Sequence, residues 1–246
     1  MPDLKKFYST RNLKGLMNPS KIHDLSLAMA VLHVLIEVDP AFRFFNLMHK
    51  DEISSAFLFM TNNSGDDGLL VFGENKSEAL FLGFAHESAL SDGYYDLLKN
   101  MRSKIPHNLI PLYDFAGKQL LDAATFCIWY NPTLHQWETA NTNFPFLSKD
   151  TQKLGLNSLP DYPWFIDYID GSAYFLNCFD GQPETFKEEV DENFYTPDVI
   201  ESFDLNVIQQ VYAHQPISEK MARSMNPNAD WEKVKEEVVS LGYPIQ

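Results

Sequence analysis

The order in which helix-like and strand-like patterns follow one another is the feature that most constrains the fold of this chain. Between Leu25 and Ile36, apolar residues return at intervals of three and four, which is the spacing of one helix face. Asp24 is the candidate N-cap of this helix, and Pro40 is expected to end it because proline cannot continue a helix.

Short apolar runs dominate the middle of the chain and are separated by polar, turn-forming segments. The predicted strands are residues 55–61, 69–73, 78–85, 124–130 and 137–142. The first three predict an antiparallel meander. Pro111 is expected in a loop, and residues 119–123 are expected to form a short helical or loop connection.

Helical patterns return in the C-terminal third. The predicted helices are residues 183–195, 205–213, 218–225 and 231–241. Pro183 is expected in the first turn of the first of them, and Asp230 is the candidate N-cap of the last. A helix, then strands, then helices predict an α+β fold with an N-terminal helix, a central, mostly antiparallel sheet of four or five strands, and a helical C-terminal third.

The composition favours one folded unit. The chain has 246 residues, of which 19 are Phe, 11 are Tyr and 4 are Trp, and chains this rich in aromatic side chains can bury a large core. No Pro/Gly/Ser-rich linker interrupts the sequence. We therefore expect a single α+β domain over residues 1–246, which includes a basic N-terminal arm at residues 1–20.

The charge is distributed very unevenly. Twelve of the acidic residues, against the single cation Lys187, lie between Asp161 and Asp204, so this stretch carries −11 of the formal net charge of −15. The first 22 residues carry +4. A field of this kind repels nucleic acids and anionic membranes and attracts basic partners.

Nothing at the N-terminus predicts secretion, because residues 1–10 lack an apolar signal core. The longest apolar-rich stretch, residues 25–38, contains His33 and Glu37 and is too short to span a bilayer. We expect a soluble, cytoplasmic protein with no membrane partner. Cys127 and Cys178 each lie in an apolar run and are expected to be buried thiols.

The segment GFAHES, at residues 83–88, contains the densest group of reactive side chains. It lies where a strand is expected to end and a helix to begin, and such junctions expose side chains. His86, Glu87 and Asp92 are candidate acids or bases for a hydrolase-like site. The alternative is structural: His86 and Ser88 satisfy backbone groups, and Ser88 caps the following helix.

The acidic stretch is also rich in aromatic residues and is the candidate recognition surface for a basic protein. Its candidate binding residues are Asp161, Asp167, Asp170, Glu184, Glu188, Asp191 and Trp164. The alternative is that aromatics such as Phe175 and Phe179 belong to the core while the carboxylates between them face water.

The usual motifs of several functional classes are missing from the sequence. It contains no GxGxxG, no GxxxxGK[ST] and no GxSxG pattern, and its seven histidines follow no metal-binding spacing. We therefore expect no cofactor, no bound metal and no nucleic-acid partner.

Several segments together resemble a bacterial family of uncharacterised proteins that has a strand ending in GF-Asp-HES. They are residues 69–91, which include GFAHES, residues 125–139, Asn226–Pro227 and Gly242–Tyr243–Pro244. This chain has Ala85 in place of the acid, which weakens any catalytic role for that position. The chain is also loosely similar to the immunity proteins of polymorphic toxin systems, including the SUKH type. That resemblance implies a protein that binds and inhibits a toxin domain without a cofactor.

Three hypotheses follow from the sequence. The first is a non-catalytic acidic binding protein, in the form of an immunity protein that neutralises a basic toxin domain. The second is a hydrolase-like enzyme with a site near His86, Glu87 and Asp92. The third is a structural protein.

Overall fold

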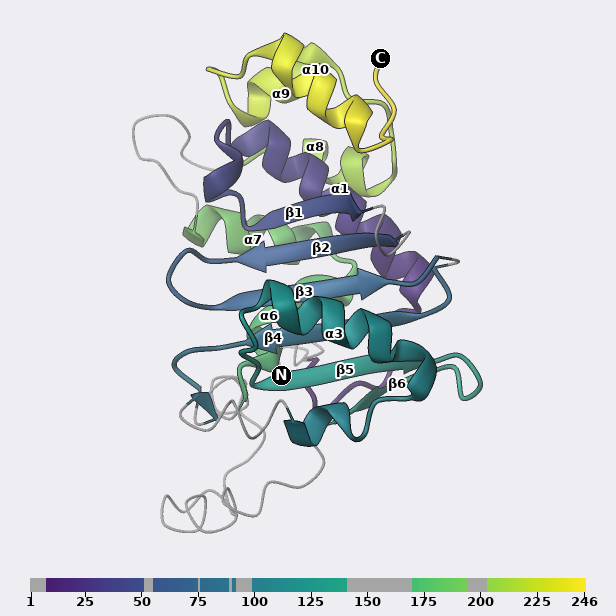
Figure 1. Cartoon of the computed structure of the whole chain (residues 1–246). Coiled ribbons are helices and arrows are strands. Elements are labelled where there is room, and N and C mark those ends of the chain that lie inside the picture. The colour runs from purple at the N-terminus through teal and green to yellow at the C-terminus, as the bar shows by residue number, and fades with distance from the viewer. Residues whose placement is uncertain are drawn as a thin grey trace, which may run out of the picture.

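The computed structural model of this chain describes residues 8–50, 55–74, 76–88, 90–91, 99–140, 170–193 and 203–246. At its centre is a six-stranded sheet in which each strand pairs with its neighbours in sequence, always antiparallel (Figure 1). The strands are β1 (Phe45–Lys50), β2 (Ser55–Thr61), β3 (Asp67–Phe72), β4 (Ala79–Phe84), β5 (Phe126–Asn131) and β6 (Gln136–Thr139). The predicted α+β fold is confirmed.

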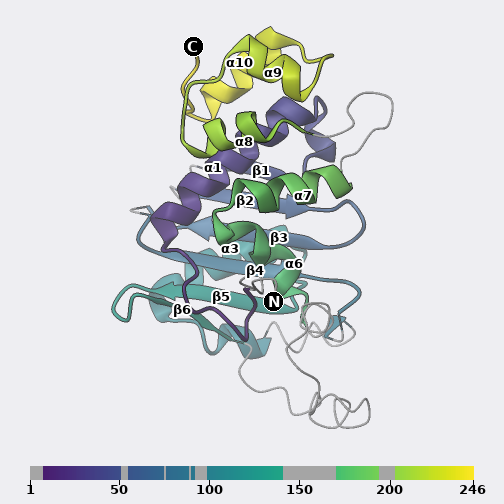
Figure 2. The same ribbon diagram turned by 180° about the vertical axis from the view of Figure 1, so that it is seen from behind.

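Helices cover both faces of the sheet. They are α1 (Pro19–Ile36), α3 (Ile110–Gln119), α6 (Ser172–Leu176), α7 (Pro183–Asn193), α8 (Leu205–Tyr212), α9 (Glu219–Met225) and α10 (Trp231–Ser240), with short 3₁₀ turns at Pro40–Phe42, His107–Leu109 and Asn177–Asp180. Figure 1 shows α3 in front of the sheet, and Figure 2 shows α1, α6 and α7 across the opposite face. The sheet is therefore buried from both sides, which explains why its central strands are apolar throughout.

Alternation along the strands divides the core into two layers. Leu70 and Phe72 of β3 pack in the larger cluster, on the side of α1, whereas Leu69 and Val71 pack in the smaller cluster against α3. This is the two-residue period that a strand imposes on its side chains.

The sheet has six strands, where four or five were predicted, because the prediction missed β1. Its sequence, FNLMHK, is short and polar at several positions. β1 is an edge strand that, among the described strands, pairs with β2 alone, and Met48 and His49 remain exposed. An edge strand of this kind lacks the continuous apolar run by which the inner strands were identified.

Helix α1 begins earlier than predicted. Asn18, rather than Asp24, is its N-cap, since the Asn18 side chain accepts a hydrogen bond from the amide of Lys21, and Pro19 occupies the first turn. The helix ends at Ile36, before Pro40. It packs against β1 on one side and against α8, α9 and α10 on the other, so it is apolar around most of its circumference.

The segment around Pro111 also differs from the prediction. It forms α3, with Pro111 in the first turn, where the missing amide hydrogen costs no helical hydrogen bond. Residues 120–122 follow as turns, with Leu121 and Asp122 at positive φ.

The described part of the predicted basic arm is packed against the fold rather than projecting from it. Tyr8, Ser9 and Thr10 are buried, and the Tyr8 amide donates to the side chain of Asn177 at 3.2 Å. The Trp137 indole donates to the carbonyl of Met17 at 2.7 Å, which fixes this segment to β6. Residues 1–7 lie outside the described residues.

The C-terminal helices follow the sequence pattern closely. Asp204, Ser218 and Asp230 cap α8, α9 and α10, as each side chain accepts a hydrogen bond from a first-turn amide. Gly242 ends the last helical segment at a φ of 76°, a backbone conformation that favours glycine. No helix within the described ranges is long and apolar enough to cross a membrane.

Candidate functional site

The loop between β2 and β3 is a rigid polar turn. The Asn62 side-chain oxygen accepts hydrogen bonds from the amides of Ser64, at 2.8 Å, and Asp66, at 3.1 Å. The Asn62 side-chain nitrogen donates to Oδ2 of Asp66 at 2.7 Å. Gly65 has a φ of 107°, which L-residues rarely adopt. These bonds fix the Asp66 carboxylate in one orientation.

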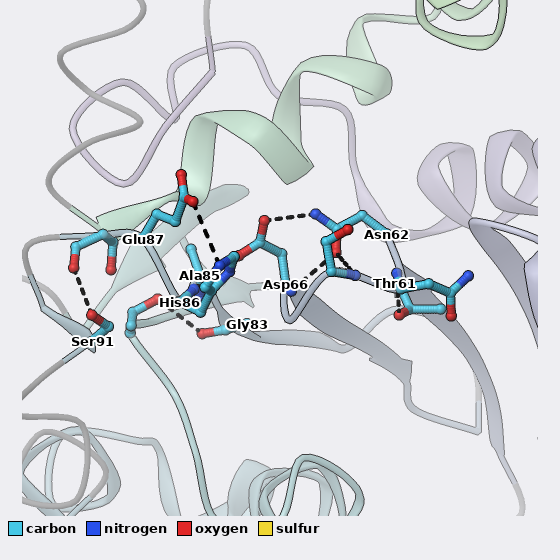
Figure 3. Close-up of polar contacts among 12 residues, drawn as sticks. Thr61, Asn62, Asp66, Gly83, Ala85, His86, Glu87 and Ser91 are labelled. Atoms are coloured by element: carbon cyan, nitrogen blue, oxygen red, sulfur yellow. Dashed lines mark hydrogen bonds and ion pairs between the residues drawn. The ribbon is translucent and has the colours of Figure 1, made fainter. Parts of the chain in front are cut away.

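His86 lies directly beside this loop, in the turn that follows β4 (Figure 3). Its backbone amide donates to Oδ1 of Asp66 at 2.8 Å, and its Nδ1 lies 2.9 Å from the same oxygen. Gly65 makes room for the imidazole, because a Cβ at that position would lie 3.2 Å from Cγ and Nδ1 of His86. The loop therefore receives the ring and orients it.

The carboxylate determines which ring nitrogen carries the proton. An ionised carboxylate only accepts hydrogen bonds, so Nδ1 of His86 carries a proton and Nε2 is the site that can take up or release one. The hydrogen bond that His86 donates to Asp66 is the main cause that raises the pKa of His86. Glu87, whose Oε1 lies 3.7 Å from Nε2, acts in the same direction. The arrangement can accept a proton at the surface.

The other residues predicted near this site are Glu87, Asp92 and Ser88. Glu87 is almost fully exposed, and Asp92 lies outside the described residues. The prediction that Ser88 caps a following helix is wrong, because its buried hydroxyl has no hydrogen-bond partner among the residues that the structure describes. The Ser88 carbonyl instead accepts bonds from the amide and the hydroxyl of Ser91, at 3.1 and 2.9 Å.

Asp66 is the residue of this site that the sequence analysis missed. It belongs to the segment interpreted only as a turn, 20 residues before His86. The signal that could have revealed it is the strand register: in a β3–β4 hairpin, Asp67 pairs with Phe84, which brings the residues just outside the two strands together.

Helix α7 brings together three of the predicted binding residues. Glu184, Glu188 and Asp191 are spaced by four and three residues, so they share one face of the helix. Glu184 and Glu188 are exposed and Asp191 is partly exposed. The opposite face carries Phe186 and Val190, which are buried in the larger core cluster. We call Glu184, Glu188 and Asp191 the acidic face of α7.

Asp191 and Glu184 make polar contacts within the protein. Asp191 pairs with Lys187 one turn earlier and accepts the amide of Phe203 at 2.9 Å. Glu184 accepts a bond from the side chain of Gln209, at 3.2 Å, which links α7 to α8. These contacts hold the carboxylates on the helix surface without removing Glu184 and Glu188 from solvent.

Asp170 is not part of this face and is a correction to the predicted binding set. Its side chain is buried: Oδ2 accepts the hydroxyl of Thr10 and Oδ1 accepts the amide of Ser172 at 3.0 Å. The carboxylate ties the N-terminal segment to α6, since a buried charge requires such partners. The other three predicted residues, Asp161, Asp167 and Trp164, lie outside the described residues.

The aromatic side chains near this stretch that the structure describes belong mainly to the core. Phe175 and Phe179 are buried against Phe81, with ring centroids 6.0 and 6.2 Å away. Gly68 and Gly83, paired across β3 and β4, leave the space for Phe175 and Phe126. The core interpretation therefore holds for Phe175 and Phe179.

The described residues contain neither a cluster of metal-ligating side chains nor a reactive thiol. Within them, no group of three or more His, Cys, Asp or Glu side chains is arranged to hold a metal ion. Cys127 and Cys178 are both buried free thiols, as expected, and burial raises the pKa of each. Neither is poised as a nucleophile, which requires the thiolate.

No protein-family model, curated protein or solved structure matches this chain.

Proposed function

We propose that this protein is a non-catalytic binding protein whose acidic face of α7 docks a basic protein. The observation that carries the proposal is the placement of Glu184, Glu188 and Asp191 on one outward face, while Phe186 and Val190 anchor the helix beneath them. Like charges one turn apart destabilise a helix by about 0.2–0.5 kcal/mol, and a basic partner bound at this face would offset that cost.

The charge of the whole chain supports the same proposal. A formal net charge of −15 accelerates the encounter with a basic protein and slows the encounter with nucleic acids and anionic membranes. By contrast, α10 carries three glutamates against Lys233 and Lys235, whereas α7 carries five acidic residues against Lys187 alone. A basic protein is therefore attracted more strongly to α7 than to α10.

The loose similarity to immunity proteins of polymorphic toxin systems, including the SUKH type, suggests the class of partner. A basic toxin domain would be steered to the protein by the acidic face of α7, and the contact would block the toxin without a cofactor. Under this proposal the protein acts in the bacterial cytoplasm, where it meets the toxin before damage occurs.

A matched pair of charge reversals tests the proposal in a pull-down from the native host. Glu184→Lys with Glu188→Lys reverses the acidic face of α7, and Glu232→Lys with Glu236→Lys reverses an exposed pair of the same spacing on α10. The wild type and the α10 variant should retain the same basic protein at low salt, and the α7 variant should lose it. Retention by all three proteins would reject α7 as the docking surface.

The bond between Asp66 and His86 favours a second candidate function, a hydrolase-like activity with His86 as general base. It can be tested with p-nitrophenyl acetate and p-nitrophenyl phosphate, by comparing the wild type with His86→Gln. A wild-type rate equal to that of His86→Gln on both substrates would eliminate this candidate.

A further inference from the structure

A cavity of about 440 Å³ lies between α8, α9 and the C-terminal residues of the chain. Figure 2 shows α8 next to the group formed by α9 and α10, near the C-terminal end. The described residues that line the cavity include none from α7 or from the turn at His86. Its volume falls in the range of about 300–1,000 Å³ that is typical of small-molecule sites.

The cavity has a small apolar side. Val207 of α8 and Met221 of α9 are buried residues of the core that also line the cavity, and Pro216 joins them from the connection between the two helices. These side chains can shield one apolar group of a ligand from water, but they are too few to hold a wholly apolar molecule.

Two opposite charges line the same cavity without pairing. Asp204 and Lys220 are both lining residues, yet no ion pair joins them in the part of the chain that the structure describes. Oδ1 of Asp204 caps α8 by accepting the amide of Asn206 at 2.9 Å, while Oδ2 has no partner among the described hydrogen bonds. A ligand that carries both charges can therefore satisfy both side chains.

The rest of the lining is polar and consists of Gln210, Gln215, Ser218, Ser224 and Gln246. The side chains of Gln215 and Gln246 make no hydrogen bond with other described residues. Each offers two donors and one acceptor oxygen to a polar ligand. Backbone hydrogen bonds hold both residues in place. The amide of Gln215 donates to the carbonyl of Gln210 at 3.0 Å, and the amide of Gln246 donates to the carbonyl of Ile217 at 2.9 Å.

We propose that this cavity binds a small zwitterion of the α-amino-acid class that carries an apolar side chain. Lys220 pairs with the carboxylate of the ligand and Asp204 with its ammonium group, and Val207 and Met221 contact its side chain. Gln215 and Gln246 bind the remaining polar atoms. A free amino acid and a dipeptide share this chemistry, and the experiment separates the two.

The test uses the full chain labelled with ¹⁵N and titrated with L-leucine while amide chemical shifts are recorded. We expect saturable shifts around Gln215, Ser218 and Lys220. The same titration with N-acetyl-L-leucine amide, which lacks both charges, should give at least tenfold weaker binding. Absence of saturable shifts with L-leucine, or equal binding of the uncharged amide, would overturn the proposal.

Two conservative variants test the charged residues without removing the fold. Asp204→Asn keeps a good helix cap, and Lys220→Gln keeps length and a donor, so each should fold as the wild type does but bind L-leucine at least tenfold more weakly. Lys233→Gln on α10 is the control and should bind normally. Unchanged affinity in both cavity variants would contradict the assignment.

A titration with L-leucyl-glycine identifies the source of the ligand. Tighter binding than that of L-leucine would assign the cavity to peptides, and weaker binding would assign it to free amino acids. Both outcomes support the zwitterion, because both ligands carry one ammonium and one carboxylate.

Discussion

The imidazole of His33 lies edge-on against the ring of Phe45, with the two ring centroids 5.1 Å apart and the planes at 75°. A second ring, Phe186 of α7, contacts it from another side at 5.7 Å. His33 is fully buried, and burial, together with the nearby Arg43 charge, lowers its pKa to about 3. The α1 layer of the core therefore requires a neutral histidine.

Acid should destabilise the protein in a defined pH window. The unfolded chain takes up a proton at His33 near pH 6.5, whereas the folded chain does so only near pH 3. Between these values the unfolded state binds more protons, so the free energy of unfolding falls as the pH falls. For His33 alone, the free energy of unfolding should be about 2 kcal/mol lower at pH 5 than at pH 7. Urea unfolding at the two pH values measures this difference.

His33→Leu removes this proton uptake while filling a similar volume, so it should remove most of that pH dependence. His23, whose pKa is also lowered, first by burial and then by Lys76, leaves a smaller dependence in the same direction. His135→Asn, on an exposed turn, is the control and should keep the full dependence. If His33→Leu and the wild type lost equal stability, the neutral state of His33 would not be the cause.

Two glycine-to-alanine substitutions should have opposite effects. A Cβ at Gly83 would lie 2.3 Å from the Phe126 ring, so Gly83→Ala should lower the free energy of unfolding by about 1–3 kcal/mol through overpacking. At Gly117, inside α3, the nearest atom would be 3.6 Å away, so Gly117→Ala should stabilise by about 0.5–1 kcal/mol. Thermal unfolding of both variants checks this, and a neutral Gly83→Ala would contradict the packing described.

The buried guanidinium of Arg43 connects three parts of the fold. It donates to the carbonyl of Glu37 at the end of α1, at 2.8 Å, and pairs with Glu237 of α10. Arg43→Met should therefore cost about 2–3 kcal/mol of unfolding free energy. Arg102→Met breaks the exposed pair with Asp114 and should cost much less, because solvent screens an exposed ion pair. Equal losses in chemical denaturation would contradict the role of Arg43.

Asp66 should control the protonation of His86. Asp66→Asn keeps an acceptor oxygen but removes the negative charge that strengthens the hydrogen bond and attracts the imidazolium, so the pKa of His86 should fall. Glu87→Gln should lower the pKa of His86 less. The Glu87 charge raises this pKa less than either the hydrogen bond to Asp66 or the Asp66 charge. NMR titration of the imidazole signals measures both, and an unchanged pKa in Asp66→Asn would show that the pair does not persist in solution.

The sequence predicted the elements that have strong local signals. Asp230 was identified as a cap because it precedes an amphipathic helix, and the inner strands were identified because they are continuous apolar runs. The start of α1 was misplaced because a helix buried on several sides lacks a clear polar boundary, although Pro19 after Asn18 was an available signal.

The candidate sites depended on contacts between distant segments, which local patterns do not contain. The acidic face of α7 was predictable, since helical spacing alone places Glu184, Glu188 and Asp191 together. The burial of Asp170 was not, because its partner Thr10 is 160 residues away in sequence. The pairing of Asp66 with His86 required the register of β3 against β4.

The most direct test of the docking proposal is the association rate constant for the purified basic partner, measured by surface plasmon resonance at increasing ionic strength. The wild type and the Glu232→Lys, Glu236→Lys variant should associate rapidly and slow steeply as salt is added, because exposed charges are screened. The Glu184→Lys, Glu188→Lys variant should associate at least tenfold more slowly at low salt, with a weaker salt dependence. Equal rates and equal salt dependence in all three proteins would contradict docking at the acidic face of α7.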